Sequence, residues 1–342
     1  MLLPMIAIGG VLLVPAAALL FATVFAAVHH AETIAHRLGD PYGAILLAVA
    51  VTVIEVALIV SILLNAPPGT SEIARDTVFA AIMIVLNGIV GLCLLIGGLR
   101  FREQEFQPRG ATGALAVLGT VVVLTLVLPN YTLAVPGPVY APPQLLFVAV
   151  VSLALYGLFL FVQMVRHQDH FRDGDPAIAA GAGHDASVTG GWWTMTVALV
   201  MLLLALLAVI GMAETLAPAV EHAVARAGLP AALVGVTIAM TVLLPEGTAA
   251  VRAAWGNRLQ TSLNLALGSA LASICLTIPV VALMSLALHQ PLTLGLEAEH
   301  MVLLVLSLFM ATLSLAMGRT TILQGGVHLV IFGAFLVLSA IP

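Results

Sequence analysis

The sequence predicts an all-α polytopic membrane protein of about ten transmembrane helices, arranged as two inverted five-helix repeats. Hydrophobic residues make up 62% of the 342 residues and charged residues 8%, too few to cover a water-soluble core. The apolar runs are long and continuous, whereas a β-barrel would show short stretches that alternate between polar and apolar residues. One long polar stretch then divides these runs into two groups of five.

Each predicted span is an apolar run bounded by proline, glycine or charged residues. A hydrocarbon core about 30 Å thick requires roughly 20 apolar residues per helix. The predicted spans are residues 3–28, 43–64, 77–99, 112–129, 143–165, 192–213, 230–251, 262–288, 300–318 and 320–341. No basic residue precedes Arg37, so a signal peptide is not expected and Met1–Val28 should remain as a span.

The polar stretch after Arg166 contains four aspartates among small residues. It predicts a first repeat at residues 1–166, an acidic linker at 167–191 and a second repeat at 192–342. Because each half has an odd number of spans, the second half enters the membrane from the opposite side. The two repeats are therefore expected to be inverted, an architecture that is common among secondary transporters.

The basic residues predict the orientation. All 11 are arginines, and with ten spans nine of them fall on one side of the membrane, with Arg75 and Arg226 on the other. Basic residues accumulate on the cytoplasmic side. We therefore expect a multi-pass protein of the bacterial inner membrane, with both termini in the periplasm and the linker in the cytoplasm.

Two glutamates lie deep inside predicted spans and occupy matching positions in the two halves. Leu38–Val60 can be laid over Leu229–Val251 without gaps, which places Glu55 on Glu246. An ionisable residue at such depth costs about 2.5–3.5 kcal/mol on insertion scales and is kept where it faces protein, water or an ion. Such a carboxyl would hold a proton until a cation displaces it. The alternative for Glu55 is a permanently protonated side chain, hydrogen-bonded within the bundle.

The residues around Glu246 add a second argument. Pro245 and Gly247 flank it, so a broken helix is expected there, with free carbonyl oxygens beside the carboxylate. Oxygen atoms of these two kinds are good ligands for a hard cation. The alternative is a proline kink at a helix end, with the glutamate at the level of the lipid headgroups.

Other polar residues inside spans could supply supporting oxygens. The candidates are Thr52, Asn87, Ser269 and Ser273. Thr52 precedes Glu55 by one turn, and the two serines lie one turn apart in the eighth span. Small hydroxyl residues also serve to pack membrane helices, which is the alternative for each. Gln324 and His328 share a helix face and are interpreted as a hydrogen-bonded structural pair.

Seven stretches, in order and covering most of the chain, carry a family resemblance. They are HHAETIAHRLGDPYG (29–43), VIEV (53–56), GGLRFREQEF (97–106), ALYGLFLFVQ with the following His167, LLPEG (243–247), LNLALGSALASICLTIPV (263–280) and GRTTILQG (318–325). In these stretches the chain resembles the cation/proton exchanger family of Ca²⁺/cation antiporters. The resemblance is strongest to its bacterial calcium/proton and sodium-potassium/proton antiporter branch.

The resemblance implies two inverted repeats, an acidic cytoplasmic linker, and exchange of cations for protons at Glu55 and Glu246 by alternating access. In two respects the chain departs from the family pattern. Family members commonly begin with an additional span, which is not expected in this chain. Calcium-selective members carry Gly-Asn-x-x-Glu around each glutamate, whereas here the asparagine positions hold Thr52 and Leu243. Since Ca²⁺ takes about six to eight oxygen ligands, the resemblance supports cation/proton exchange more strongly than it supports calcium.

The sequence therefore predicts a secondary active antiporter that exchanges metal cations, Ca²⁺ and also Na⁺ or K⁺, for protons. The alternative is a cation channel or uniporter without proton coupling, which would not need paired protonatable groups. HExxH, GxSxG and Walker motifs are absent, so the chain is not expected to be an enzyme or an ATP-driven pump. The expected partners are the lipid bilayer and the transported ions, with no resident cofactor and no nucleic acid.

Overall fold

The computed structural model confirms the predicted fold class. It describes residues 10–38, 49–57, 59–60, 72–171, 192–226, 228, 230 and 232–341. Among these residues, eight helices are long and apolar enough to cross a membrane. A shorter apolar stretch, Ala18–Ala31, and a helical segment at residues 49–57 lie in the two remaining predicted spans. Residues 172–191, most of the predicted linker, lie outside the described residues.

The helices follow the predicted order. In the first half they are α1 (Gly10–Leu38), α3 (Glu72–Met83), α4 (Val90–Phe101), α5 (Pro108–Val122) and α6 (Pro142–Phe161). In the second half they are α8 (Trp192–Arg226), α9 (Ala232–Trp255), α10 (Leu259–Leu288), α11 (Ala298–Ala316) and α12 (Ile322–Ala340). Short turns of other pitch are the π-helical η1 (Ile84–Ile89), η2 (Val123–Val127) and η4 (Val162–Arg166) and the 3₁₀ turns η3 (Leu128–Tyr131) and η5 (Gln168–Phe171). The turn η1 joins α3 to α4 as one span.

Helix α1 runs about one membrane-spanning length and then continues in polar sequence. The predicted span ends at Val28, whereas the helix ends at Leu38. Residues 29–38 contain neither proline nor glycine, so nothing in their backbone chemistry stops the helix. Hydropathy marks the end of the apolar stretch, and the helix extends beyond it.

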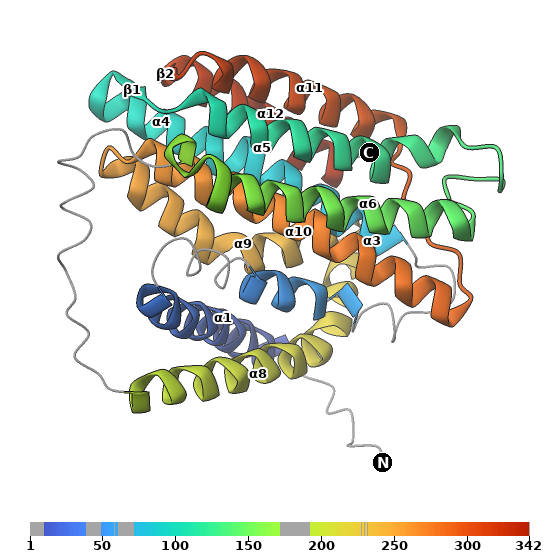
Figure 1. Ribbon diagram of the computed structural model, residues 1–342. Coiled ribbons are helices and arrows are strands. Elements are labelled where there is room, and N and C mark those ends of the chain that lie inside the picture. The colour runs from blue at the N-terminus through green and yellow to red at the C-terminus, as the bar shows by residue number, and fades with distance from the viewer. Residues whose placement is uncertain are drawn as a thin grey trace.

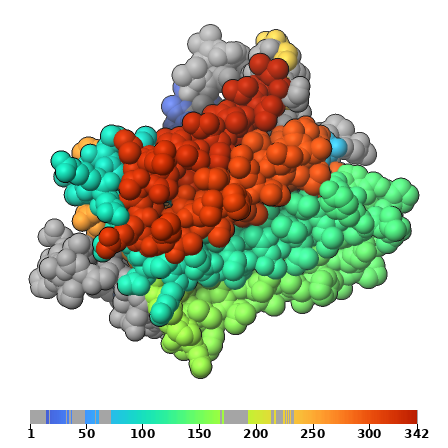
Figure 2. Space-filling view, turned by 90° about the horizontal axis from the view of Figure 1, so that it is seen from above, coloured from blue at the N-terminus to red at the C-terminus, as the bar shows by residue number. Residues whose placement is uncertain are grey.

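The helices form two packed groups (Figure 1). One group pairs α1 with α8, and its small apolar core also includes the segment 49–57 and Val242 of α9. The other group contains α3 to α6 and α9 to α12 around a larger core, in which Phe79, Leu118 and Phe335 are fully buried. Figure 2 shows one face of this larger group, where α11 and α12 lie beside α5 and α6. The segment 49–57 therefore lies where the two groups meet.

The packing agrees with two five-helix repeats. Helix α12, the tenth span, packs against α4 of the third, and α10, the eighth span, packs against α6 of the fifth. In two five-span repeats the third span is equivalent to the eighth and the fifth to the tenth, so these two contacts are equivalent to each other. Five spans per half also means that the chain direction reverses between the repeats.

Close backbone contact joins α4 to α12. A Cβ built at Gly98 would lie 2.5 Å from the backbone nitrogen of Ile322, and one built at Gly325 would overlap the backbone of Leu95. Glycine is therefore required for this approach. Next to it, strands β1 (Glu103–Glu105) and β2 (Arg319–Thr321) pair antiparallel, with Gln104 opposite Thr320. Two of the stretches that carry the family resemblance thus lie side by side, at residues 97–106 and 318–325.

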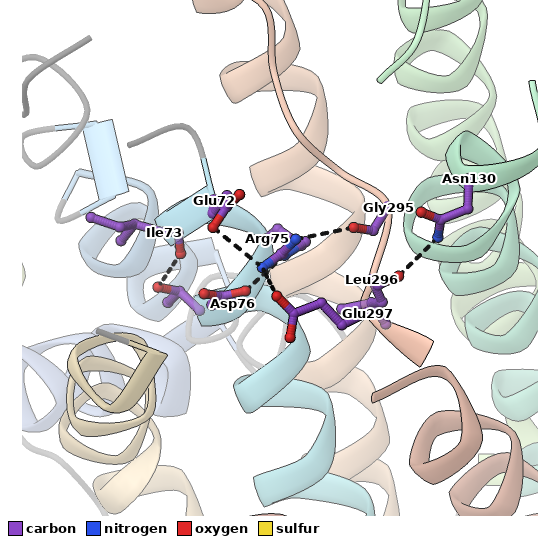
Figure 3. Close-up of polar contacts among 9 residues, drawn as sticks. Glu72, Ile73, Arg75, Asp76, Asn130, Gly295, Leu296 and Glu297 are labelled. Atoms are coloured by element: carbon purple, nitrogen blue, oxygen red, sulfur yellow. Dashed lines mark hydrogen bonds and ion pairs between the residues drawn. The ribbon is translucent and has the colours of Figure 1, made fainter. Parts of the chain in front are cut away.

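A buried arginine anchors a loop of the second half on the first half (Figure 3). Arg75 of α3 donates to Asp76 Oδ1 at 2.7 Å and to the carbonyl oxygen of Gly295 at 3.1 Å. Glu72 and Glu297 lie 3.8 and 3.9 Å from its guanidinium group. The side chain of Asn130 donates to the carbonyl oxygen of Leu296 at 3.0 Å, so the loop between α10 and α11 is held at two points.

Candidate functional site

The two buried glutamates come from different halves of the chain and meet at one helix. Glu55 lies on the helical segment 49–57 and is 2% exposed, and Glu246 lies on α9 and is 8% exposed. The hydroxyl of Ser273 donates to Glu55 Oε1 at 2.6 Å, and the hydroxyl of Ser269 donates to Glu246 Oε2. Both serines belong to α10.

The spacing of the serines brings the carboxylates together. Ser269 and Ser273 are four residues apart, so they share a face of α10 and lie about 6 Å apart along its axis. Glu55 and Glu246, which align when the two halves are superposed by sequence, therefore contact neighbouring turns on the same face of α10. This is a compact set of carboxylate and hydroxyl oxygens deep in the bundle.

Neither glutamate forms an ion pair in the part of the chain that the structure describes. The ion pairs in that part involve Arg75 and Arg319 instead. A serine hydroxyl can donate to a carboxylate, and its oxygen can also accept a proton or coordinate a cation. The arrangement can therefore hold either a proton or a cation between Glu55 and Glu246.

The helix around Glu246 differs from the prediction. The predicted break at Pro245 is wrong, because α9 continues through it from Ala232 to Trp255. Proline lacks an N–H group, so only the carbonyl oxygen of Thr241, four residues earlier, loses its helical donor. The Thr248 hydroxyl also donates to the carbonyl oxygen of Pro245, at 2.7 Å. One lost hydrogen bond, rather than a break, marks this part of the helix.

Gly247 has a packing role. A Cβ built on it would lie 3.2 Å from Cδ1 of Ile89, which belongs to the π-helical turn η1. The absence of a side chain lets η1 pack closely against α9 next to Glu246. Gly247, which was expected to help break the helix, therefore lies in a continuous helix and allows this close contact.

The predicted supporting residues divide into two sets. Ser269 and Ser273 contact the glutamates directly, and Thr52 is buried one turn before Glu55. Asn87 makes its hydrogen bonds elsewhere, to Ser307 of α11 and His328 of α12. These bonds are not to Glu55 or Glu246, so they give no support to the predicted role of Asn87 in ligation or proton passage.

The predicted pair of Gln324 and His328 is wrong. Oε1 of Gln324 accepts from the backbone nitrogen and the hydroxyl of Thr321, at 2.9 and 2.7 Å, in a capping box at the start of α12. His328 contacts Asn87 and Ser314 instead.

Ser307 and Ser314 of α11 are two polar residues that are not predicted from the sequence. They lie seven residues apart on one face of an apolar helix, and this spacing is a pattern that could have indicated them.

Comparison with known proteins identifies the family. The family described as "Sodium/calcium exchanger protein" matches residues 6–165 and 197–341, nearly the whole chain in two parts. The chain belongs to this exchanger family. The two matched parts coincide with the two predicted repeats, and the exchanger family is one of membrane transporters rather than enzymes.

Individual transporters resemble the chain along most of its length. The protein y4hA of Sinorhizobium fredii is 55% identical over 332 residues, which cover 97% of this chain and 89% of that protein. "Sodium-potassium/proton antiporter ChaA" of Escherichia coli is 35% identical over 325 residues, covering 93% of this chain and 85% of that one. The family resemblance found in the sequence is thereby confirmed.

Solved structures share the exchanger fold. The structure of native YfkE superposes with a TM-score of 0.75 at 18% identity, covering 97% of this chain and 92% of that chain. The crystal structure of the H⁺/Ca²⁺ exchanger CAX gives a TM-score of 0.69 at 15% identity, covering 94% and 80%. At these identities the likeness establishes the fold alone.

Proposed function

We propose that the protein is a secondary active antiporter that exchanges metal cations for protons by alternating access, with Glu55 and Glu246 as the groups that bind both. One observation carries the proposal. The two glutamates, one from each repeat, contact serines one turn apart on α10, so their carboxylates can reach the same ion. Burial of both side chains excludes bulk water from this point.

The chemistry follows from two carboxylates in a buried setting. Two ionised carboxylates close together repel each other, so at least one of them holds a proton while no cation is bound. A cation that arrives between them stabilises both negative charges and displaces the proton. Cation binding therefore weakens as the pH falls, and each cation that enters releases at least one proton.

The oxygen donors favour Na⁺ or K⁺ over Ca²⁺. The positions one turn before the glutamates hold Thr52 and Leu243, and the buried Leu243 side chain offers no oxygen. Ca²⁺ takes about six to eight oxygen ligands, and the two carboxylates and two serine hydroxyls reach six only when both carboxylates bind through both of their oxygens. The similarity to the Escherichia coli sodium-potassium/proton antiporter supports this preference. Ca(2+)/H(+) antiporters, such as that of Aphanothece halophytica at 25% identity, are more distant.

A channel or uniporter without proton coupling is the competing function. A channel conducts through an open pore, whereas Glu55 and Glu246 are almost fully enclosed by protein. Paired carboxylates that can hold a proton are also needed for exchange and not for conduction. Both points support the antiporter.

Everted membrane vesicles with an imposed pH gradient test the proposal. Addition of Na⁺, K⁺ or Ca²⁺ should dissipate the gradient in the wild type, and Glu55→Gln and Glu246→Gln should each abolish this response. Glutamine keeps the shape but can neither release a proton nor supply a full charge. Because both carboxylates act on one ion, the losses should not add in the double variant.

Glu105→Gln is the matched control, because Glu105 is an exposed glutamate paired with Arg319 at 2.7 Å. This variant should behave like the wild type. Near-normal proton-coupled exchange in Glu55→Gln or Glu246→Gln, at wild-type abundance in the membrane, would remove that glutamate from the mechanism. Cation flux that leaves the pH gradient intact would establish the channel instead.

A further inference from the structure

A second buried polar cluster lies outside the glutamate site. It consists of Asn87 in η1, Ser307 and Ser314 in α11, and His328 in α12, and none of the four is more than 2% exposed. Asn87 Nδ2 donates to Ser307 Oγ at 2.8 Å, and Asn87 Oδ1 lies 3.1 Å from His328 Nδ1. His328 Nε2 lies 3.2 Å from Ser314 Oγ. We call these four residues the Asn87 cluster.

The hydrogen bonds of the Asn87 cluster run in one direction. Since Nδ2 of Asn87 donates to Ser307, its Oδ1 is the acceptor, and His328 Nδ1 must carry the hydrogen. A neutral His328 then accepts at Nε2 from the Ser314 hydroxyl. Ser307 in turn donates to the carbonyl oxygen of Leu303 at 2.7 Å. With a neutral histidine, each polar side-chain atom of the cluster has a hydrogen-bond partner, and these bonds join η1, α11 and α12 to one another.

The Asn87 cluster holds a turn of unusual geometry. Asn87 lies within η1, and π-helical turns are rare, occur mostly as single turns within α-helices and are frequent at functional sites. The position of His328 is fixed by close packing, because a Cβ built at Gly91 would lie 2.9 Å from the Cβ of His328. The cluster therefore determines how η1 is placed against α11 and α12.

The same turn contacts the neighbour of a site glutamate. Ile89, two residues after Asn87 in η1, packs against Gly247 of α9, and Gly247 directly follows Glu246. The turn also packs against α10, the helix that carries Ser269 and Ser273. A displacement of η1 would thus move the backbone beside Glu246 relative to its serine partner.

We propose that Asn87, Ser307, Ser314 and His328 are positioning residues for exchange. They hold η1 so that Ile89 supports Gly247 and keeps the Glu246 carboxylate in register with Ser269. The proposal rests on the proposed function, in which Glu246 binds the cation. It predicts weaker cation binding with turnover largely kept, whereas loss of a site glutamate abolishes exchange.

The decisive variant replaces both polar partners by apolar side chains of similar size, Asn87→Leu with His328→Phe. The double variant removes both members of the Asn87–His328 hydrogen bond, so neither is left without its partner, and Ser307 keeps its bond to the carbonyl oxygen of Leu303. Ser314 loses its bond to His328, but a helical serine can donate to the carbonyl oxygen four residues earlier, so the double variant should unfold near the wild-type temperature. In proteoliposomes its half-saturating Na⁺ or K⁺ concentration should rise about tenfold, while the maximal exchange rate stays within about twofold. A double variant with wild-type stability and wild-type half-saturation would overturn the proposal.

Two single variants at Ser307 test the proposal if the double variant fails to insert. Ser307→Ala removes the acceptor for Asn87, and Ser307→Thr restores a hydroxyl. Alanine should raise the half-saturating concentration and threonine should return it toward wild type. The control is Ser152→Ala, because the buried Ser152 hydroxyl bonds only to Val148 of its own helix and should have no effect. Equal half-saturation in Ser307→Ala and Ser152→Ala would also overturn the proposal.

Discussion

The Ser273 hydroxyl lies 2.6 Å from a carboxylate oxygen of Glu55, although 218 residues separate the two along the chain. The corresponding bond from Ser269 to Glu246 joins residues only 23 apart. Helix α10 thus contacts one buried glutamate from each repeat. A helix that contacts the acidic residue of each half is well placed to couple the movements of the two halves to one bound ion.

Alanine at either serine should weaken cation binding without abolishing exchange. Ser273→Ala and Ser269→Ala each remove one hydroxyl, and a hydrogen bond to a charged group contributes about 1.5–3 kcal/mol. Since about 1.4 kcal/mol corresponds to tenfold, each variant should raise the half-saturating cation concentration by roughly tenfold or more. Titration of exchange in proteoliposomes with each cation measures this.

Thr125→Val provides the comparison for the serine variants. The buried Thr125 hydroxyl bonds to carbonyl oxygens of its own helical span, and it should be replaceable without a change in affinity. If Ser273→Ala matched Thr125→Val in half-saturation, the Ser273 hydroxyl would have no part in binding.

The buried Arg75 should matter for stability far more than the exposed Arg319. Arg75→Gln removes the bonds to Asp76 and Gly295 that anchor the loop before α11, and should cost about 1–3 kcal/mol. Arg319 pairs with Glu105 at 2.7 Å, but both side chains are more than half exposed, so Arg319→Gln should cost less than about 1 kcal/mol. Thermal unfolding in detergent compares the two, and equal losses would contradict the anchoring role of Arg75.

The sequence was sufficient to predict the features that depend on hydropathy and on rare residues. The spans follow from apolar length, and Glu55 and Glu246 stand out because carboxylates are so costly at that depth. Ser269 and Ser273 could be paired with the site because they lie one turn apart on one helix. None of these inferences required knowledge of which helices pack together.

Features that depend on helix packing could not be predicted in this way. The partners of Asn87 are set by how η1, α11 and α12 face one another, and no local pattern encodes that rotation. Strands β1 and β2 have three residues each, which is too short for the alternation of apolar and polar residues that indicates a strand. Pro245 favours a break, yet α9 continues because a proline removes only one hydrogen bond and the surrounding helices hold the rest.

Reporter fusions test the orientation predicted from the arginines. A reporter that is active only in the cytoplasm should be active when inserted within Asp173–Ser187 and silent when fused after Pro342. Nine of the 11 arginines fall on the side predicted to be cytoplasmic, which is the physical basis of this expectation. Fusion of a periplasm-specific reporter at the same two positions is the control, and it should give the opposite pattern. Activity of the cytoplasmic reporter after Pro342 alone would reverse the assigned orientation.

Leu243→Asn should shift cation preference toward Ca²⁺. Leu243 is 2% exposed and lies three residues before Glu246 on α9, so the amide oxygen of an asparagine there would lie within one turn of the carboxylate. One more oxygen ligand favours Ca²⁺, because the present carboxylates and serine hydroxyls provide at most six of the about six to eight oxygens that Ca²⁺ takes. The measured quantity is the ratio of half-saturating Ca²⁺ to half-saturating Na⁺ in proteoliposomes, and it should fall.

The control for this substitution is Leu244→Asn, because Leu244 is 39% exposed on the same helix and its side chain points away from the buried face. It adds the same amide to the same turn of α9 but away from Glu246, so it should leave the ratio unchanged. A general effect of polarity in the span would alter both variants alike. If Leu243→Asn inserted at normal abundance and kept the wild-type ratio, position 243 would not contribute to the ion site, and the preference for Na⁺ or K⁺ would have to arise from other residues.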